Sequence, residues 1–151
     1  MNDKANILIV DDEEVVRISH LRSLEGTECN ARSVEDGREA IEVMEQSPFD
    51  VVLLDLRMPD LDGMEVLKTI KQRWPDSEVV VITGYPSIES AKQAVRLGAH
   101  NYLAKPVEPN DVIKAAHDAM NQKRWALRSD REDRQEFDFS APLSANELVT
   151  H

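Results

Sequence analysis

Short apolar runs that alternate with helical patterns constrain the fold of this chain most strongly. Three of these runs are almost free of polar residues: Asn6 to Val10, Val51 to Leu54 and Val79 to Ile82. Such runs are typical of strands that are buried on both faces of a sheet. Weaker strand patterns cover residues 28–34 and 101–104. The sequence therefore predicts five strands, three of them buried on both faces.

A helical pattern follows each predicted strand. Asp36 and Ser87 are suited to cap the second and fourth helices, and Pro109 is suited to begin the last one. The predicted helices cover residues 13–24, 36–46, 64–74, 87–97 and 109–120. Apolar residues at helical spacing predict the buried face of each helix. In the first helix these are Val15, Val16, Ile18, Leu21 and Leu24. In the fourth helix they are Ile88, Ala91, Ala94, Val95 and Leu97.

Strands that alternate with helices are joined by right-handed crossovers and therefore form a parallel sheet with helices on both faces. The predicted class is a doubly wound, five-stranded α/β fold. Ligands of such folds bind at the carboxyl edge of the sheet.

Charged and polar residues follow the predicted strands at this edge. Asp11 and Asp12 follow the first strand, Asp55 the third and Lys105 the last, while Thr83 ends the fourth. Because clustered carboxylates repel one another, they favour a divalent cation, and their oxygens suit Mg²⁺. A lysine and a hydroxyl beside them can bind phosphate oxygens. The chemistry indicated is phosphoryl transfer to the Asp55 carboxylate.

The net charge of −11 argues against binding of nucleic acid by this chain and against an anionic membrane surface. One cysteine, Cys29, excludes an internal disulfide. No apolar run is long enough to cross a bilayer, and the N-terminus lacks the features of a signal peptide. We therefore expect a cytoplasmic protein.

Four segments resemble the signatures of the response-regulator receiver domain of two-component signalling. They are the acidic pair Asp11-Asp12, the segment 51–65 around Asp55, the segment 81–84 that contains Thr83, and the segment 102–106 that contains Lys105-Pro106. The segments 84–87 and 98–103 are most similar to receivers of bacterial enhancer-binding activators. The resemblance implies a flavodoxin-like strand order of 2-1-3-4-5.

The resemblance also implies a role for each site residue. Asp55 would accept the phosphoryl group, Lys105 and Thr83 would contact it, and Thr83 and Tyr102 would act as a switch. Magnesium would be held by Asp11, Asp12, Asp55 and the backbone carbonyl of Arg57. The peptide bond before Pro106 would be cis.

The partners implied are a sensor histidine kinase or a phosphotransfer protein. A downstream effector, or a second copy of the chain, would bind the face between Ile88 and Met120. Such a protein phosphorylates and dephosphorylates itself and is not a turnover enzyme.

Three other functions are the alternatives to this interpretation. The chain could be the N-terminal receiver of a longer transcriptional regulator, or a docking module that is never phosphorylated, although the complete set of site residues argues against the latter. An aspartate-dependent phosphatase of the haloacid-dehalogenase type would need an acid two residues after Asp55, where this chain has Arg57.

The amino-acid composition changes after the last predicted helix, which ends at residue 120. Residues 128–136 carry dense mixed charge without an apolar face. We therefore predict a receiver domain over residues 1–123, followed by a helical extension and a flexible tail over residues 124–151.

Overall fold

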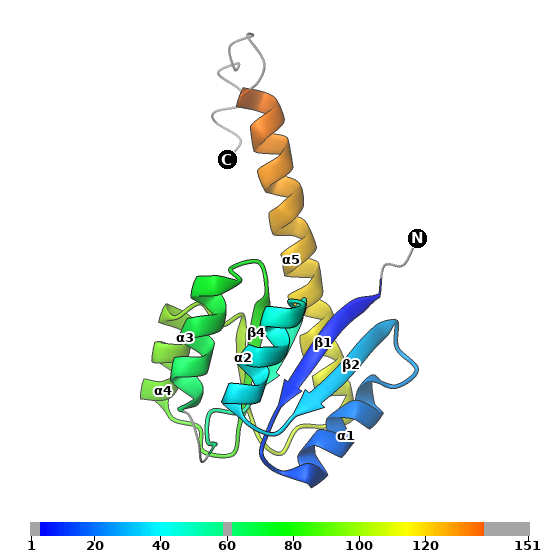
Figure 1. The fold of residues 1–151 in the computed structure, drawn as a ribbon, viewed down its shortest axis with the longest axis vertical. Helices are drawn as coiled ribbons and strands as arrows, with labels where there is room; N and C mark the ends of the chain where they lie inside the picture. Colours follow the sequence, from blue (N-terminus) through cyan, green and yellow to red (C-terminus); the bar gives the residue numbers. More distant parts are fainter. Residues whose placement is uncertain (1–3, 59–61, 138–151) are drawn as a thin grey trace.

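Five parallel strands form one sheet at the centre of the computed structural model, which describes residues 4–58 and 62–137 (Figure 1). Their order across the sheet is β2-β1-β3-β4-β5, as predicted. The strands are β1 (Ala5–Val10), β2 (Cys29–Val34), β3 (Val51–Leu54), β4 (Glu78–Thr83) and β5 (Asn101–Ala104). The register pairs Val10 with Leu54, so β1 and β3 end side by side.

Five helices connect and extend the strands. They are α1 (Glu14–Leu24), α2 (Gly37–Gln46), α3 (Gly63–Arg73), α4 (Ile88–Arg96) and α5 (Pro109–Phe137). The predicted caps are confirmed, because the side chain of Asp36 accepts a hydrogen bond from the backbone of Glu39 and that of Ser87 from the backbone of Ser90. Asp62 caps α3 in the same way.

The side chains of the sheet alternate between two cores. Leu8, Val10, Val52 and Leu54 point toward α2, α3 and α4, whereas Ile7, Ile9, Val51 and Leu53 point toward α1 and α5. Figure 1 shows these two helix layers on opposite sides of the sheet. Because both faces are covered, the central strands have no polar face, which explains their continuous apolar sequence.

The predicted buried face of α1 is only partly correct. Val15 is 80% exposed and Ile18 is 42% exposed, while His20 and Leu24 are buried. Leu24 is buried and Leu21 packs against the core as predicted, but the apolar residues of this helix are spread around its circumference, so Val15 and Ile18 face outward. Within the part of the chain whose side chains the structure describes, the Nδ1 atom of His20 is the one buried side-chain nitrogen or oxygen without a hydrogen-bond partner.

The predicted stripe of α4 is also only partly correct. Ala94 is buried, but Ile88 is 76% exposed and Val95 is 64% exposed. A nine-residue helix at the edge of the sheet covers little of the core with its short alanine face. Ile88 and Val95 therefore form an apolar surface on α4.

Helix α5 runs past the sheet and continues to Phe137, so it projects from the domain (Figure 1). Before it leaves, Lys123 forms an ion pair with Asp50, whose other carboxylate oxygen accepts a hydrogen bond from the backbone of Asn6 at 2.8 Å. This contact ties α5 to the ends of β1 and β3 that lie opposite the carboxyl edge. The helical extension predicted within residues 124–151 is confirmed as far as Phe137, and the rest of that predicted segment, residues 138–151, lies outside the described residues.

Replacement of Gly63 by alanine should destabilise the fold. A Cβ atom there would lie 2.4 Å from the Cα atom of Leu56, whose backbone cannot move aside easily. We expect Gly63→Ala to lower the free energy of unfolding by about 1–3 kcal/mol, measured by urea denaturation. Gly84→Ala is the control, because its Cβ would make only an ordinary contact of 3.8 Å with Lys105. Equal stability of the two variants would contradict the prediction.

Candidate functional site

The ends of four strands place the predicted site residues along one edge of the sheet. Hydrogen bonds between backbones continue past the strands, from Asp55 N to Val10 O at 2.9 Å and from Lys105 N to Thr83 O at 2.8 Å. Asp11, Asp55 and Lys105 each follow their strand directly. Because parallel strands all end at this edge, side chains far apart in sequence become neighbours.

The Lys105 ammonium connects the carboxylates of this edge. Its Nζ atom lies 2.8 Å from Asp11 Oδ2, 3.3 Å from Asp55 Oδ2 and 3.5 Å from Glu13 Oε1. Asp11 and Asp55 are almost completely buried, whereas Lys105 keeps some exposure. A buried carboxylate requires a partner of opposite charge, and here one ammonium serves two of them.

Backbone groups satisfy the remaining oxygens of the two buried aspartates. Glu13 N donates to Asp11 Oδ1 at 2.9 Å, and Arg57 N donates to Asp55 Oδ1 at 3.2 Å. These bonds fix the orientation of both carboxylates, and Asp55 lines the cleft at this edge.

Four carboxylates form a possible cation site. One oxygen each from Asp11, Asp12, Glu13 and Asp55 lies within 4.8 Å of the others. Asp12 and Glu13 are exposed, so they could exchange solvent for a cation. Sequence reasoning missed Glu13, although its place directly after Asp12 was a signal. The set of hard oxygen donors fits Mg²⁺.

The charge balance of this cluster shifts two pKa values. Burial raises the pKa of Asp55, and repulsion by Asp11 adds to this effect, while the Arg57 N–H group and Lys105 oppose it. Burial alone would lower the pKa of Lys105, but its hydrogen bonds and attraction to Asp11 and Asp55 prevail and raise it. Lys105 therefore stays charged, and the ionised form of Asp55 is disfavoured.

His20 lies in the electrostatic field of the same cluster. Burial lowers the pKa of His20, attraction to Asp11 opposes the shift, and Lys105 adds to it. The imidazole is therefore neutral at pH 7.

Thr83 is buried beside the cluster at the end of β4. Its Oγ1 atom accepts a hydrogen bond from the backbone N of Tyr85 at 3.1 Å. The Tyr85 ring in turn lies under the Arg57 guanidinium, at 4.0 Å from the ring centroid. Arg57 and Tyr85 line one open cleft together with Asp12, Asp55 and Lys105.

Tyr102 lies next to the start of α4. Its hydroxyl accepts a hydrogen bond from Ser87 N at 3.2 Å and shares a second hydrogen bond with the Ser90 hydroxyl. The ring is half-buried and packs on the core beneath α4. The predicted switch residues thus occupy adjacent strands, with Tyr102 paired to Val81 in the register and Thr83 paired to Ala104.

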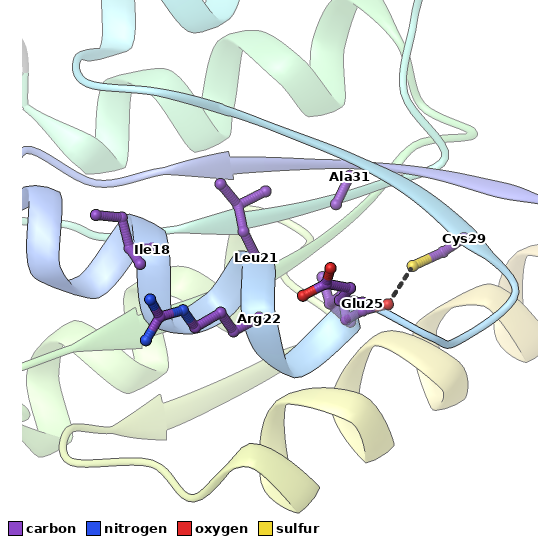
Figure 2. Close-up of a pocket in the computed structure, with 7 residues that line it drawn as sticks. Ile18, Leu21, Arg22, Glu25, Cys29 and Ala31 are labelled. Atoms are coloured by element: carbon purple, nitrogen blue, oxygen red, sulfur yellow. Dashed lines mark hydrogen bonds between the residues drawn. The ribbon is translucent and has the colours of Figure 1, made fainter.

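A second hollow lies between α1 and β2 (Figure 2). Its lining is mainly apolar and includes Leu21, Cys29 and Ala31, together with the exposed Arg22 and Glu25. The Cys29 thiol donates a hydrogen bond to the backbone oxygen of Leu24 at 3.6 Å. This hollow brings no set of carboxylates or phosphate-binding groups together, so the chemistry lies at the carboxyl edge.

The structure gathers Asp11, Asp12, Asp55, Thr83 and Lys105 at one site. Arg57 lies at its rim, and Tyr102 stands apart at α4. The Lys105-Pro106 peptide bond is cis, as expected.

Comparisons with known proteins agree with this geometry. Residues 7–117 match the family model described as the response regulator receiver domain. The chain is 40% identical over 101 residues to the response regulator protein PilR of Pseudomonas aeruginosa, an alignment that covers 67% of this chain and 23% of PilR. It is 39% identical over 111 residues to the transcriptional regulatory protein ZraR of Escherichia coli K12, which covers 71% of this chain and 24% of ZraR.

Among solved structures, NtrX from Brucella abortus superposes with a TM-score of 0.79 at 28% identity, covering 97% of this chain and 33% of NtrX. This chain therefore spans about a quarter of the length of the curated relatives and a third of the NtrX chain. No helix within the described ranges is both long and apolar enough to pass through a membrane.

Replacement of Asp55 by asparagine should stabilise the fold at neutral pH without divalent cations. Because the pKa of Asp55 is raised in the folded state, ionisation costs stability as pH rises through the unfolded and then the folded pKa. Asparagine removes that cost, so we expect Asp55→Asn to melt a few degrees higher at pH 7, corresponding to about 1 kcal/mol. The difference should shrink as pH falls toward 4.

Thermal melts in EDTA at several pH values measure this difference. The exposed Asp76→Asn serves as the control and should not change the melting temperature. A lower melting temperature for Asp55→Asn at pH 7 would show that Lys105 stabilises the ionised carboxylate more than burial disfavours it.

Proposed function

We propose, since the chain belongs to the response regulator receiver domain family, that it is a signalling switch controlled by phosphorylation of Asp55. The contact of one ammonium, Lys105, with both Asp11 and Asp55 is the observation that supports this most strongly. It places a cation where a phosphoryl group on Asp55 would bring new negative charge. The acidic cluster around it agrees with a phosphoacceptor site.

The proposed reaction transfers a phosphoryl group from a phosphohistidine to Asp55. An Asp55 carboxylate oxygen forms the new P–O bond, the N–P bond of the donor breaks, and the donor imidazole takes up a proton. Lys105 neutralises a phosphoryl oxygen, and the Thr83 hydroxyl donates a hydrogen bond to another. Later attack by water on the acyl phosphate returns the Asp55 carboxylate and releases phosphate, which resets the switch.

Asp11, Asp12, Asp55 and the backbone carbonyl of Arg57 are the proposed ligands of Mg²⁺, with Glu13 close enough to join them through water. When bound, Mg²⁺ offsets the repulsion between the carboxylates and the incoming phosphoryl group. The buried aspartates are already oriented by backbone N–H groups, so the site needs little rearrangement to hold the ion.

We propose that the conformational change spreads from Thr83 to the surface formed by the segment from Ile88 to Met120. When Thr83 turns to the phosphoryl group, Tyr102 can leave the start of α4 and fill the space behind it. The exposed Ile88 and Val95 then lie on the part of the surface that changes. Receiver domains act with histidine kinases, and we propose a downstream effector or a second copy of this chain as the reader of the face.

A second proposal concerns the organisation of the protein. We take residues 1–123 as the receiver and the remainder as an extension that connects it to its output. The relatives PilR and ZraR are named as regulators, and this chain spans about a quarter of their length. This observation favours a role as the receiver of a longer transcriptional regulator. The complete set of site residues argues against a docking module that is never phosphorylated, because such a module would not need them.

Phosphorylation should occur on Asp55 alone. We expect incubation with acetyl phosphate and Mg²⁺ to add one phosphoryl group that is stable in acid and labile in alkali, because it is an acyl phosphate. Intact-mass spectrometry should show the added mass in the wild type and in Asp76→Asn, and a loss of more than tenfold in Asp55→Asn. Equal labelling of the Asp55→Asn variant would exclude Asp55 as the acceptor.

Magnesium should stabilise the folded protein through Asp12. At a concentration one hundredfold above its dissociation constant, a ligand of the folded state adds about 2.7 kcal/mol. We expect Asp12→Asn to lose most of this gain in thermal melts. Asp62→Asn should keep it, because Asp62 lines the same cleft but uses its carboxylate to cap α3. Equal losses in both variants would place the ion elsewhere.

Thr83 should connect phosphorylation to the output face. We expect Thr83→Ala to form the acyl phosphate but to lose the phosphorylation-dependent change of the Tyr102 ring signals in NMR spectra, because no hydroxyl turns toward the phosphoryl group. Thr69→Ala, on α3, is the control. An unchanged Tyr102 response in Thr83→Ala would exclude this route.

A further inference from the structure

The strand β2 forms one edge of the sheet and has β1 as its neighbour (Figure 1). No other strand among residues 4–58 and 62–137 pairs with its outer side. Asn30 and Arg32 are exposed and Ala31 is half-buried, so this strand is accessible along most of its length. An unpaired edge presents backbone N–H and C=O groups to which a further strand can bond.

One hydrogen bond shows which backbone groups of β2 point toward β1. Val34 O accepts a hydrogen bond from Asp11 N at 3.2 Å, so the backbone of Val34 faces β1. Successive residues of a strand direct their backbone groups to opposite sides. The odd-numbered residues of β2 therefore present theirs to the outside, and these are Cys29, Ala31 and Ser33.

The outward backbone groups match those of a second copy of the same strand. Cys29 N is already bonded to Thr27 O at 2.9 Å, so the outer side offers Cys29 O and the N–H and C=O groups of Ala31 and Ser33. We propose that β2 of a second copy of this chain pairs here, antiparallel and about a twofold axis at Ala31. Ala31 N then donates to Ala31 O of the other copy, and Ser33 N donates to its Cys29 O. Each bond occurs twice by symmetry, and together they use both free outward donors.

The side chains on the α2 side of β2 are complementary in charge in this register. Arg32 lies opposite Asn30 of the other copy and diagonal to its Glu28, within reach of a long side chain. The axis produces this pair of opposite charges twice. An axis at Arg32 would instead set two guanidinium groups against each other, which is unfavourable. The charges thus favour a second copy of the strand, paired at Ala31.

The other side of β2 contributes to the apolar hollow between α1 and β2 (Figure 2). Ala31 lines this hollow together with Leu21 and with Ile18, which is 42% exposed. Because the axis at Ala31 is perpendicular to the sheet, the hollows of both copies open on the same side and lie next to each other. Burial of their apolar surface adds to the free energy of the backbone bonds.

This pairing leaves the opposite edge of the sheet free. β2 and β5 are the two outermost strands, so a dimer joined at β2 can still present the segment from Ile88 to Met120 to an effector. The inference does not rest on the proposed function, because β2 carries no residue of the phosphorylation site. One edge strand buries less surface than the roughly 1,200–2,000 Å² of a stable complex, so we expect a weak dimer.

Sedimentation velocity of the full chain tests the pairing, in about 0.15 M salt to screen the repulsion between two acidic chains. We expect the sedimentation coefficient to rise with protein concentration. Ala31→Pro should raise the dissociation constant at least about tenfold, because it removes one N–H donor from each copy. Proline is tolerated in an edge strand where the lost N–H faces outward, so the melting temperature should stay close to that of the wild type.

An exchange of charges tests the register at exposed side chains and leaves the backbone unaltered. Arg32→Glu alone and Glu28→Arg alone should each weaken the dimer, and the double variant should restore it, because the pair is then reversed. Arg96→Glu is the matched control with the same change of charge, at an exposed position on α4, and should leave dimerisation unchanged.

A mixture of labelled and unlabelled chains reports the register directly. We expect an intermolecular NOE between the Hα atoms of Asn30 and Arg32, which form the closely spaced, non-hydrogen-bonded pair of the antiparallel strands. A chain that stays monomeric at millimolar concentration, a dimer that Ala31→Pro leaves unchanged, or a double charge variant as weak as the single ones would each overturn the proposal. Loss of the dimer in Arg96→Glu but not in Arg32→Glu would overturn it too and place the second copy on α4.

Discussion

One ammonium group between two buried carboxylates determines how this site is built. Lys105 reaches Asp11 and Asp55 only because β5, β1 and β3 run in parallel and end at the same edge. Without that cation, the burial of two aspartates so close together would be strongly unfavourable. The order and the parallel direction of the strands are therefore what allow two buried aspartates to share one ammonium group.

The same contact only partly balances the charge of the two buried aspartates. Lys105 keeps its charge, while burial disfavours the ionised form of Asp55 even though an N–H group and an ammonium contact it. A cation bound among these carboxylates would recover part of that free energy. The apolar layers on both sides of the sheet supply the stability that allows this loss.

The sequence was most informative where one physical effect dominated. The continuous apolar run from Val51 to Leu54 indicated a strand buried on both faces. The residues at the strand ends could be assigned to one edge because parallel strands all end at the same edge. The sequence was less informative about which face of a helix packs against the sheet. The packed side of α1 is set by His20 and Leu24, and no periodicity would choose a histidine over Ile18. Contacts between loops, such as that of Arg57 with Tyr85, depend on turns that a linear pattern does not encode.

The anchoring of α5 to the opposite end of the sheet makes this helix a lever arm. The ion pair of Lys123 with Asp50 acts as the fulcrum, and the helix beyond it reaches about 21 Å to Phe137 at 1.5 Å per residue. A tilt of about 10° at the fulcrum would displace the far end by about 4 Å on that length. Small rotations within the domain would thus be amplified into movements large enough to separate or align whatever the helix carries.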